Sequence, residues 1–167
     1  MTYDLLLGSN MGDRAGLLRQ ARAQLSQYAG KIVRQSALYE SEPWGFASPC
    51  RFINQAVEIE TALLPLPLLS VTQQIEKNLG REKPHGAGYS SRTMDIDILF
   101  AGMEIIHTSR LVIPHPRLHE RRFALLPLCE ILPDREHPVL KKNIRTLLQE
   151  CSDAGDVAMW RGDDVRM

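Results

Sequence analysis

The sequence is poor in cysteine, has no excess of charge of either sign and lacks long hydrophobic runs. Its three cysteines, Cys50, Cys129 and Cys151, show no CxxC spacing, which argues against a zinc site and favours unpaired thiols in a reducing compartment. Twenty basic residues balance twenty acidic ones, which argues against broad binding to nucleic acids or membranes. No apolar run approaches membrane-spanning length, and residues 1–4 do not resemble a signal peptide. We therefore expect a cytoplasmic protein.

Several motifs that would identify a function directly are also absent. There is no P-loop, no GxGxxG, no internal repeat and no linker between domains. The composition is that of an ordinary globular protein, with 44% hydrophobic and 24% charged residues. A chain of 167 residues can bury a sizeable core as one unit, so we expect a single domain over residues 1–167.

The hydrophobic patterns predict the order strand, helix, strand, strand, helix, strand. The strands are expected at 3–7, 32–38, 52–61 and 94–100, and the helices at 14–28 and 68–79. This order is that of the ferredoxin-like βαββαβ arrangement, an α+β fold in which helices pack on an antiparallel sheet. A hairpin-like piece at 101–106, a short or broken helix at 124–132 and a short helix at 144–150 are expected to extend it.

The most informative stretch is the alternating segment from Met94 to Phe100. Side chains two apart in a strand share a face, so Asp95 and Asp97 are expected to point the same way, about 7 Å apart. Ile96, Ile98 and Phe100 are then expected on the opposite face. Paired carboxylates suit a divalent cation, but they are equally compatible with a solvated edge strand.

Basic residues flank this segment on both sides. Residues 81–91 form a glycine-bearing loop with Arg81, Lys83 and His85, which can be a phosphate clamp or a solvated charge cluster. Downstream, His115 lies between two prolines that restrict its backbone, and its charge can change near neutral pH. A lone histidine is usually structural, so the position of His115 in this loop does not by itself assign it a role.

Aromatic residues mark two further places where a flat ligand can bind. Residues 42–49 contain Trp44, Phe46 and two prolines, which fits either a loop folded over the core or a lid over an apolar ligand. In the strand 52–61, Phe52 is expected to share a face with Asn54. An aromatic ring beside an amide can sandwich and hydrogen-bond a heterocycle, although edge packing explains the pair as well.

Taken together, these segments resemble the 6-hydroxymethyl-7,8-dihydropterin pyrophosphokinase family of folate biosynthesis. The resemblance runs from about residue 3 to 134. Its motifs are, in the family's order, Leu6-Leu7-Gly8-Ser9-Asn10, residues 39–45, Phe52-Ile53-Asn54, Gly80-Arg81, Arg92-Thr93-Met94-Asp95-Ile96-Asp97-Ile98-Leu99 and Ile113-Pro114-His115-Pro116. The Arg-Thr-x-Asp-x-Asp-x-x-Leu segment followed by Pro-His is the specific part, since the other pieces are common separately.

The resemblance implies transfer of diphosphate from ATP to the hydroxymethyl oxygen of the pterin, with release of AMP. It implies that two Mg²⁺ ions bind to Asp95 and Asp97. It assigns catalytic or phosphate contacts to Arg81, Arg92, Asp95, Asp97 and His115. It assigns ATP binding to Gln73, Glu76, Lys83, Arg92, Ile98, Arg110, His115 and Arg121. It assigns pterin binding to Ser41, Pro43, Trp44, Phe52, Asn54, Asp95 and Phe123.

The chain departs from the family pattern at a few positions. Tyr89-Ser90-Ser91 stands where Trp-Gly-Pro is frequent, Lys83 is the candidate for a second basic residue of the loop, and Val112 replaces a position that often carries a hydroxyl. ATP and the pterin are the expected partners, with no nucleic acid and no membrane, and the protein is expected to be a monomer. Two other readings are a metal-dependent nucleotidyltransferase, which would release pyrophosphate, and a ligand-binding module without catalysis.

Overall fold

The computed structural model describes residues 1–42, 50–80 and 94–162. In chain order its elements are β1 (Thr2–Ser9), α1 (Arg14–Tyr28), β2 (Lys31–Gln35), β3 (Tyr39–Ser41), β4 (Phe52–Glu60), α2 (Pro65–Asn78), β5 (Asp95–Ala101), β6 (Ile106–His107), β7 (Val112–Ile113), a 3-10 turn (Leu118–Glu120), α3 (Arg122–Ile131), α4 (Ile144–Glu150) and β8 (Val157–Met159). In these ranges, six strands form an antiparallel sheet in the order β5-β1-β4-β3-β8, with β2 also paired to β4. The strands β6 and β7 pair separately.

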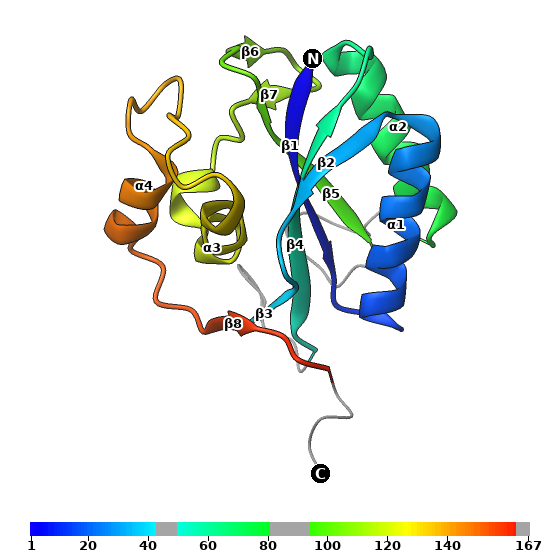
Figure 1. Ribbon diagram of the computed structural model, residues 1–167, viewed down its shortest axis with the longest axis horizontal. Helices are drawn as coiled ribbons and strands as arrows, with labels where there is room; N and C mark the ends of the chain where they lie inside the picture. The colour runs from blue at the N-terminus through cyan, green and yellow to red at the C-terminus, as the bar shows by residue number, and fades with distance from the viewer. Residues whose placement is uncertain (43–49, 81–93, 163–167) are drawn as a thin grey trace.

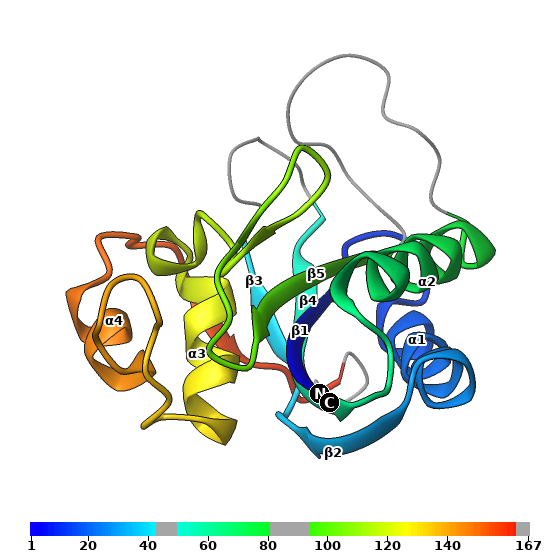
Figure 2. The same ribbon diagram turned by 90° about the horizontal axis from the view of Figure 1, so that it is seen from above.

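Helices cover both faces of the sheet, so the molecule has three layers (Figure 1). Figure 2 shows α1 and α2 on one side of the strands, and α3 with α4 behind it on the other. Each face has its own apolar core. Leu18 and Leu25 of α1 and Ile75 of α2 pack in the first core, and Leu125 of α3 and Leu147 of α4 pack in the second. We call these faces the α1/α2 face and the α3/α4 face.

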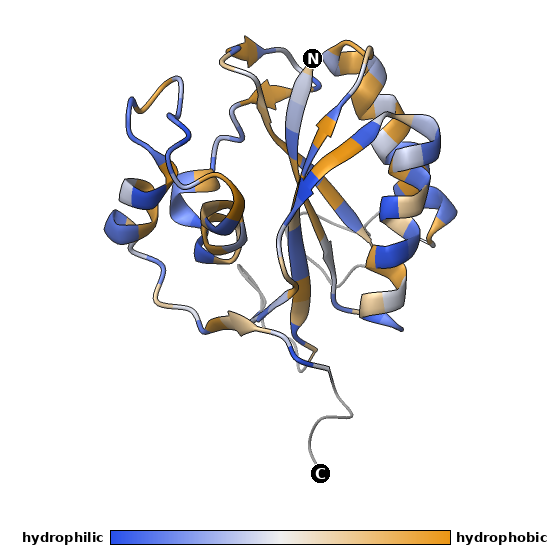
Figure 3. Cartoon of the chain, viewed as in Figure 1, coloured by the Kyte–Doolittle hydropathy of each residue, from blue (hydrophilic) through white to orange (hydrophobic). Residues whose placement is uncertain are grey.

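The local sequence accounts for the helix boundaries on the α1/α2 face. The side chain of Asp13 accepts a hydrogen bond from the Gly16 N–H at 3.2 Å, which is the N-cap expected before α1. The helix α2 begins at Pro65, three residues before the predicted start, because prolines are tolerated in a first helical turn. Figure 3 shows apolar and polar residues interspersed along strands and helices, which suits elements that bury only part of their surface.

A bulge in β5 corrects one prediction about the diacid strand. Ile96 and Ile98 pack in the α1/α2 core as predicted, but Phe100 lies in the α3/α4 core. The cause is a register shift, since Leu5 of β1 pairs with Ile98 whereas its neighbour Asp4 pairs with Phe100. The extra residue, Leu99, reverses the alternation for the rest of the strand.

Other element boundaries also differ from the predictions. The strand β1 continues through Gly8 to Ser9 instead of ending at Leu7. The strand expected at 32–38 is two pieces, β2 and β3, which both pair with β4, and Ser36 between them bonds to Ala56. The strand β8 was not predicted, because its three residues carry no clear alternation. Within the described ranges, none of the helices combines the length and hydrophobicity that a membrane crossing requires.

Candidate active site

One row of residues crosses three strands of the sheet and organises the candidate site. Gly8 on the central strand β1 pairs with Asn54 on β4 at one side and with Asp95 on β5 at the other. A Cβ atom at Gly8 would lie 2.6 Å from Oδ1 of Asn54 and 3.8 Å from Cδ1 of Phe52. Only glycine therefore leaves room for this amide beside the strand. Gly8 belongs to the first motif of the resemblance, but the sequence alone assigned it no role in the candidate site.

The pterin-side residues on β3 and β4 lie together. Asn54 is 3% exposed, and its Nδ2 donates a hydrogen bond to Oγ of Ser41 at 3.0 Å. This bond fixes the orientation of the amide, so that Oδ1 faces Gly8. Phe52 is half-buried and is two residues from Asn54 on the same strand, so both point to the α3/α4 face. Phe123, in the first turn of α3, packs at the edge of the core on that face.

The two predicted metal ligands occupy the α3/α4 face of β5. Asp97 pairs with Leu6, which belongs to the core on that face, and the neighbouring Ile96 and Ile98 pack in the opposite core. Nη1 of Arg121 lies 3.9 Å from Oδ2 of Asp97. The Arg121 guanidinium also lies over the Phe123 ring, 5.7 Å from its centre. Arg121 thus connects the carboxylate pair with the aromatic residue of α3.

Glu76, which is predicted to bind the nucleotide, makes a hydrogen bond to the backbone of β5. It is 6% exposed, and its Oε2 accepts a hydrogen bond from the Ile96 N–H at 2.8 Å. Ile96 lies between Asp95 and Asp97 on an edge strand, so this bond fixes the backbone between the two carboxylates.

His115 is attached to the same strand through the bulge. Its backbone N–H donates to the carbonyl oxygen of Leu99 at 3.0 Å. Burial, and then the positive charge of Arg121, lower the pKa of His115 to about 4, although Asp95 acts in the opposite direction. The ring is therefore neutral at pH 7. Since the Arg117 N–H donates to Nδ1 at 3.2 Å, the ring proton lies on Nε2, where it can donate to an anion.

The carboxylate pair fits magnesium by its donor chemistry. Mg²⁺ prefers oxygen ligands and usually keeps several waters, so that one or two protein carboxylates and substrate phosphates complete its shell. Asp95 and Asp97 are partly exposed and provide such oxygens on one face. The described residues contain no group of three or more His, Cys, Asp or Glu side chains that could hold a metal ion. Substrate phosphates and water would therefore have to supply the other ligands.

The remaining predicted residues have less defined positions. Gln73 on α2 and Arg110 in the turn between β6 and β7 are exposed, and the Ile98 side chain is buried in the α1/α2 core. Five predicted residues lie outside the described ranges, namely Pro43, Trp44, Arg81, Lys83 and Arg92. The sequence offered no signal for the contact between Arg121 and Asp97, because nothing local relates residues so far apart in the chain.

Comparison with known proteins gives a consistent family. Residues 5–133 match the profile of 7,8-dihydro-6-hydroxymethylpterin-pyrophosphokinase (HPPK). The chain is 48% identical over 128 residues to the 2-amino-4-hydroxy-6-hydroxymethyldihydropteridine pyrophosphokinase of Bacillus subtilis, which covers 76% of this chain and 75% of that protein. It is 38% identical over 149 residues to the Aquifex aeolicus protein of the same name, which covers 89% of this chain and 91% of that one.

Solved structures show the same fold. The crystal structure of Plasmodium falciparum HPPK-DHPS matches with a TM-score of 0.72 over 89% of this chain, at 20% identity. This chain spans 44% of that longer protein, so the likeness concerns one part of it. The residues that match the family profile include the row of Asn54, Gly8 and Asp95 as well as His115. The chain therefore belongs to the HPPK family.

Proposed function

We propose that this site transfers the terminal diphosphate of ATP to the hydroxymethyl group of 6-hydroxymethyl-7,8-dihydropterin, releasing AMP for folate biosynthesis. The main support for the proposal is the row of Asn54, Gly8 and Asp95 across the sheet. It places a fixed amide and an aspartate on either side of Gly8, on the one face that α3 covers. A flat heterocycle bound at the amide is thereby directed toward the carboxylate pair.

The pterin-binding role falls to the residues on β3, β4 and α3. Asn54 presents the hydrogen-bonding edge of its amide, and its bond to Ser41 keeps that edge from rotating. Phe52 and Phe123 provide aromatic faces from β4 and α3 for stacking on the two sides of the ring. Pro43 and Trp44 remain predictions from the resemblance.

The phosphate role falls to the residues around β5. Asp95 and Asp97 would hold two Mg²⁺ ions, which would neutralise the charge of the phosphates. Arg121 lies beside Asp97 and adds a fixed positive charge. The neutral His115 ring can donate from Nε2 to a phosphate oxygen, where negative charge develops on the AMP leaving group. Glu76 keeps the two aspartates in place through the Ile96 N–H.

The bond changes follow from this arrangement. The hydroxymethyl oxygen attacks the β-phosphorus of ATP and loses its proton. The bond between the β-phosphorus and the oxygen that links it to the α-phosphate breaks, and AMP leaves with that oxygen. Positioning and charge neutralisation provide most of the rate enhancement in such phosphoryl transfers.

The deciding experiment is to identify the nucleotide product. The protein is mixed with Mg²⁺, ATP and the reduced hydroxymethylpterin, and nucleotides are separated by chromatography. The proposal requires AMP in proportion to pterin diphosphate. Release of pyrophosphate would indicate a nucleotidyltransferase, ADP would indicate simple phosphoryl transfer, and pterin binding without any nucleotide product would indicate a binding module.

We further propose that the fold is the ferredoxin-like βαββαβ arrangement with additions. The order β5-β1-β4 with β2 and β3 on the far side supports it, because β2 and β3 together act as one strand along β4. A single domain, a cytoplasmic location and a monomeric state remain predictions from the sequence.

A further inference from the structure

We infer that Asp153 is a positioning residue for the pterin side of the site, acting through the segment 153–160. This segment lies beyond residues 5–133, which the family profile matches. It contacts α3 at its beginning and β3 near its end, and these elements carry Phe123 and Ser41. The inference rests on the proposed pterin site. It adds a segment that connects the two walls of this site, which are β3 with Ser41 and α3 with Phe123.

At its first residue the segment caps α3. The Arg122 N–H donates to Oδ2 of Asp153 at 3.1 Å, and the Gly155 N–H donates to Oδ1 at 2.9 Å. Arg122 is the first residue of α3, and the residue before it, Arg121, makes no side-chain cap hydrogen bond to the helix. Asp153 therefore satisfies a helix N–H that no cap within the helix's own sequence reaches, and its negative charge suits the N-terminus of the helix.

The capped turn is the one that carries the ligand residues of α3. Arg122 has Arg121 on one side and Phe123 on the other. Arg121 lies 3.9 Å from Asp97 and stacks on the Phe123 ring. A cap bond to the residue between them restricts the backbone of both.

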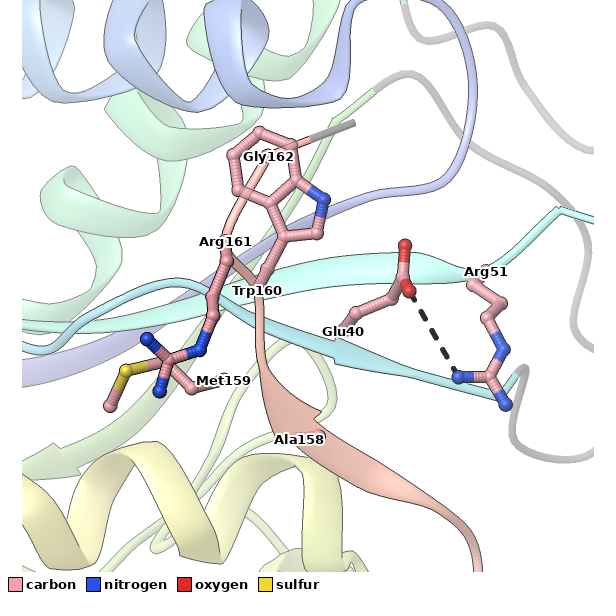
Figure 4. Close-up of a pocket in the computed structure, with 7 residues that line it drawn as sticks. All are labelled: Glu40, Arg51, Ala158, Met159, Trp160, Arg161 and Gly162. Atoms are coloured by element: carbon pink, nitrogen blue, oxygen red, sulfur yellow. Dashed lines mark ion pairs between the residues drawn. The ribbon is translucent and has the colours of Figure 1, made fainter. Parts of the chain in front are cut away.

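At its other end the segment is attached to β3. The strand β8 pairs antiparallel with β3, and Val157 stands opposite Ser41. The Trp160 N–H donates to the carbonyl oxygen of Leu38 at 2.8 Å, which extends the pairing by one residue. Oδ2 of Asp156 lies 3.1 Å from Nη2 of Arg51, but this ion pair is exposed to solvent and contributes little to the attachment, which depends on the backbone pairing. Figure 4 shows the β8 residues beside Glu40 of β3 and Arg51.

The segment thus connects two walls that approach the ligand from different layers. Ser41 orients Asn54 on the sheet, and Phe123 stands on the helix above it. The core between α3 and β4 fixes the distance between the layers approximately, but binding of a flat ring depends on shifts well below the size of a side chain. A single cap bond contributes little to the stability of the whole fold, so its loss is expected to affect the geometry of the first turn of α3 more than folding.

The test compares Asp153→Ala with Asp153→Asn and with Asp156→Ala as a matched control. Asp156→Ala removes the same charge from the same segment but leaves the α3 cap intact. We expect Asp153→Ala to raise the pterin KM about tenfold, with kcat changed less than about threefold, because an N-cap loss perturbs one turn. Asp153→Asn, which keeps an acceptor oxygen, should recover part of the loss, and Asp156→Ala should stay within about twofold of the unsubstituted protein.

Amide hydrogen exchange gives a readout that does not depend on catalysis. Asp153→Ala should increase exchange at residues 122–125 relative to Asp156→Ala, whether or not the protein makes AMP. An unchanged pterin KM in a folded Asp153→Ala protein that releases AMP would overturn the inference, and so would unchanged exchange in the first turn of α3. If the unsubstituted protein released no AMP, the proposed function would fail, while the exchange comparison would still decide whether Asp153 holds that turn.

Discussion

The α3/α4 face of the sheet carries acidic residues at both of its ends, and the two ends differ in how these residues are neutralised. The site end holds Asp95 and Asp97 of β5, with Arg121 beside them. The far end holds Asp4 of β1 and Glu58 of β4, which stand opposite each other in the sheet, with Arg135 beside them. Both ends therefore combine two carboxyl groups with arginine, and at the far end Nε of Arg34 also lies 3.4 Å from Oε1 of Glu58.

The far end is closed to solvent. Asp4 is fully buried, and Nη1 of Arg135 lies 3.1 Å from its Oδ2 and 3.9 Å from Oε2 of Glu58. The Arg135 guanidinium also lies 5.3 Å from the centre of the Phe100 ring, and it donates to the Gly102 carbonyl oxygen. Burial, together with the neighbouring Glu58, raises the pKa of Asp4 to about 8 although Arg135 lowers it.

The site end is more open. The Asp97 side chain is 25% exposed, and its distance to Arg121 is 3.9 Å, longer than that between Asp4 and Arg135. The type of residue therefore does not separate a structural carboxyl group from a ligand-binding one. Access to solvent separates them, since a buried carboxyl group stays protonated or needs a partner inside the protein, whereas a partly exposed carboxylate can accept an external cation.

The largest expected effect comes from breaking the site end. Asp97→Ala should lower kcat by about 10³-fold, because metal-dependent charge stabilisation amounts to several kcal/mol. The pterin Kd should stay within about twofold, since Asp97 is not among the predicted pterin contacts. Steady-state kinetics and calorimetric titration with the pterin measure the two quantities. Asp134→Ala, which removes an exposed carboxylate of the pair with Arg145, is the control. A folded Asp97→Ala protein that loses the pterin as well would contradict this division of roles.

Breaking the far end should change stability instead of turnover. Arg135→Ala removes the arginine beside Asp4 and leaves Glu58 with only the more exposed Arg34, so we expect a cost of about 2 kcal/mol in the free energy of unfolding, as for the loss of a hydrogen bond to a charged group. Urea unfolding measures this value, and kcat below the unfolding range should change less than about twofold. Arg145→Ala breaks an exposed ion pair of 2.8 Å and should cost less than about 1 kcal/mol. Equal losses in the two variants would show that the far end is not a buried unit.

A smaller effect is expected from filling the space between Gly8 and the side-chain amide of Asn54. The new methyl group in Gly8→Ala would lie 2.6 Å from Oδ1 of Asn54, so the amide must move away from its bond to Ser41. We expect the pterin KM to rise about tenfold, in line with the loss of one hydrogen bond to a buried group. The KM for ATP is the internal control and should change little. If only the KM for ATP rose, Gly8 would belong to the nucleotide side.

The smallest effect is a pH dependence of stability at the far end. The pKa of Asp4 is about 8 in the folded protein against 3.8 for an ordinary aspartate, so the folded state keeps a proton that the unfolded state releases. Stability from this group is complete below the unfolded pKa and declines as pH rises through 8. Asp4→Asn cannot titrate, so the unsubstituted protein should lose about 1 to 2 kcal/mol more than this variant between about pH 7 and about pH 9. Urea unfolding at the two pH values measures the difference, and parallel losses would show that Asp4 is ionised throughout.

Local sequence was sufficient to predict the face of the sheet on which the proposed metal ligands lie. Alternation from Met94 to Ile98 placed Asp95 and Asp97 together and Ile96 and Ile98 opposite, because side-chain direction in a strand depends only on the local backbone. The same alternation placed Phe52 on one face with Asn54. Helix capping, which is also local, predicted Asp13 before α1. These features need no information from distant parts of the chain.

How these features combine depends on contacts between distant parts of the chain. The bulge at Leu99 places Phe100 in the opposite core, and the Leu99 carbonyl oxygen accepts a hydrogen bond from the His115 N–H. Glycine is needed at position 8 because the Asn54 amide packs beside it. Asp153 caps a helix that begins 31 residues earlier in the chain. Each of these depends on a partner that the local sequence does not specify, since packing across the sheet brings it near. Backbone direction is a local property, whereas the neighbours of a side chain are set by the whole fold.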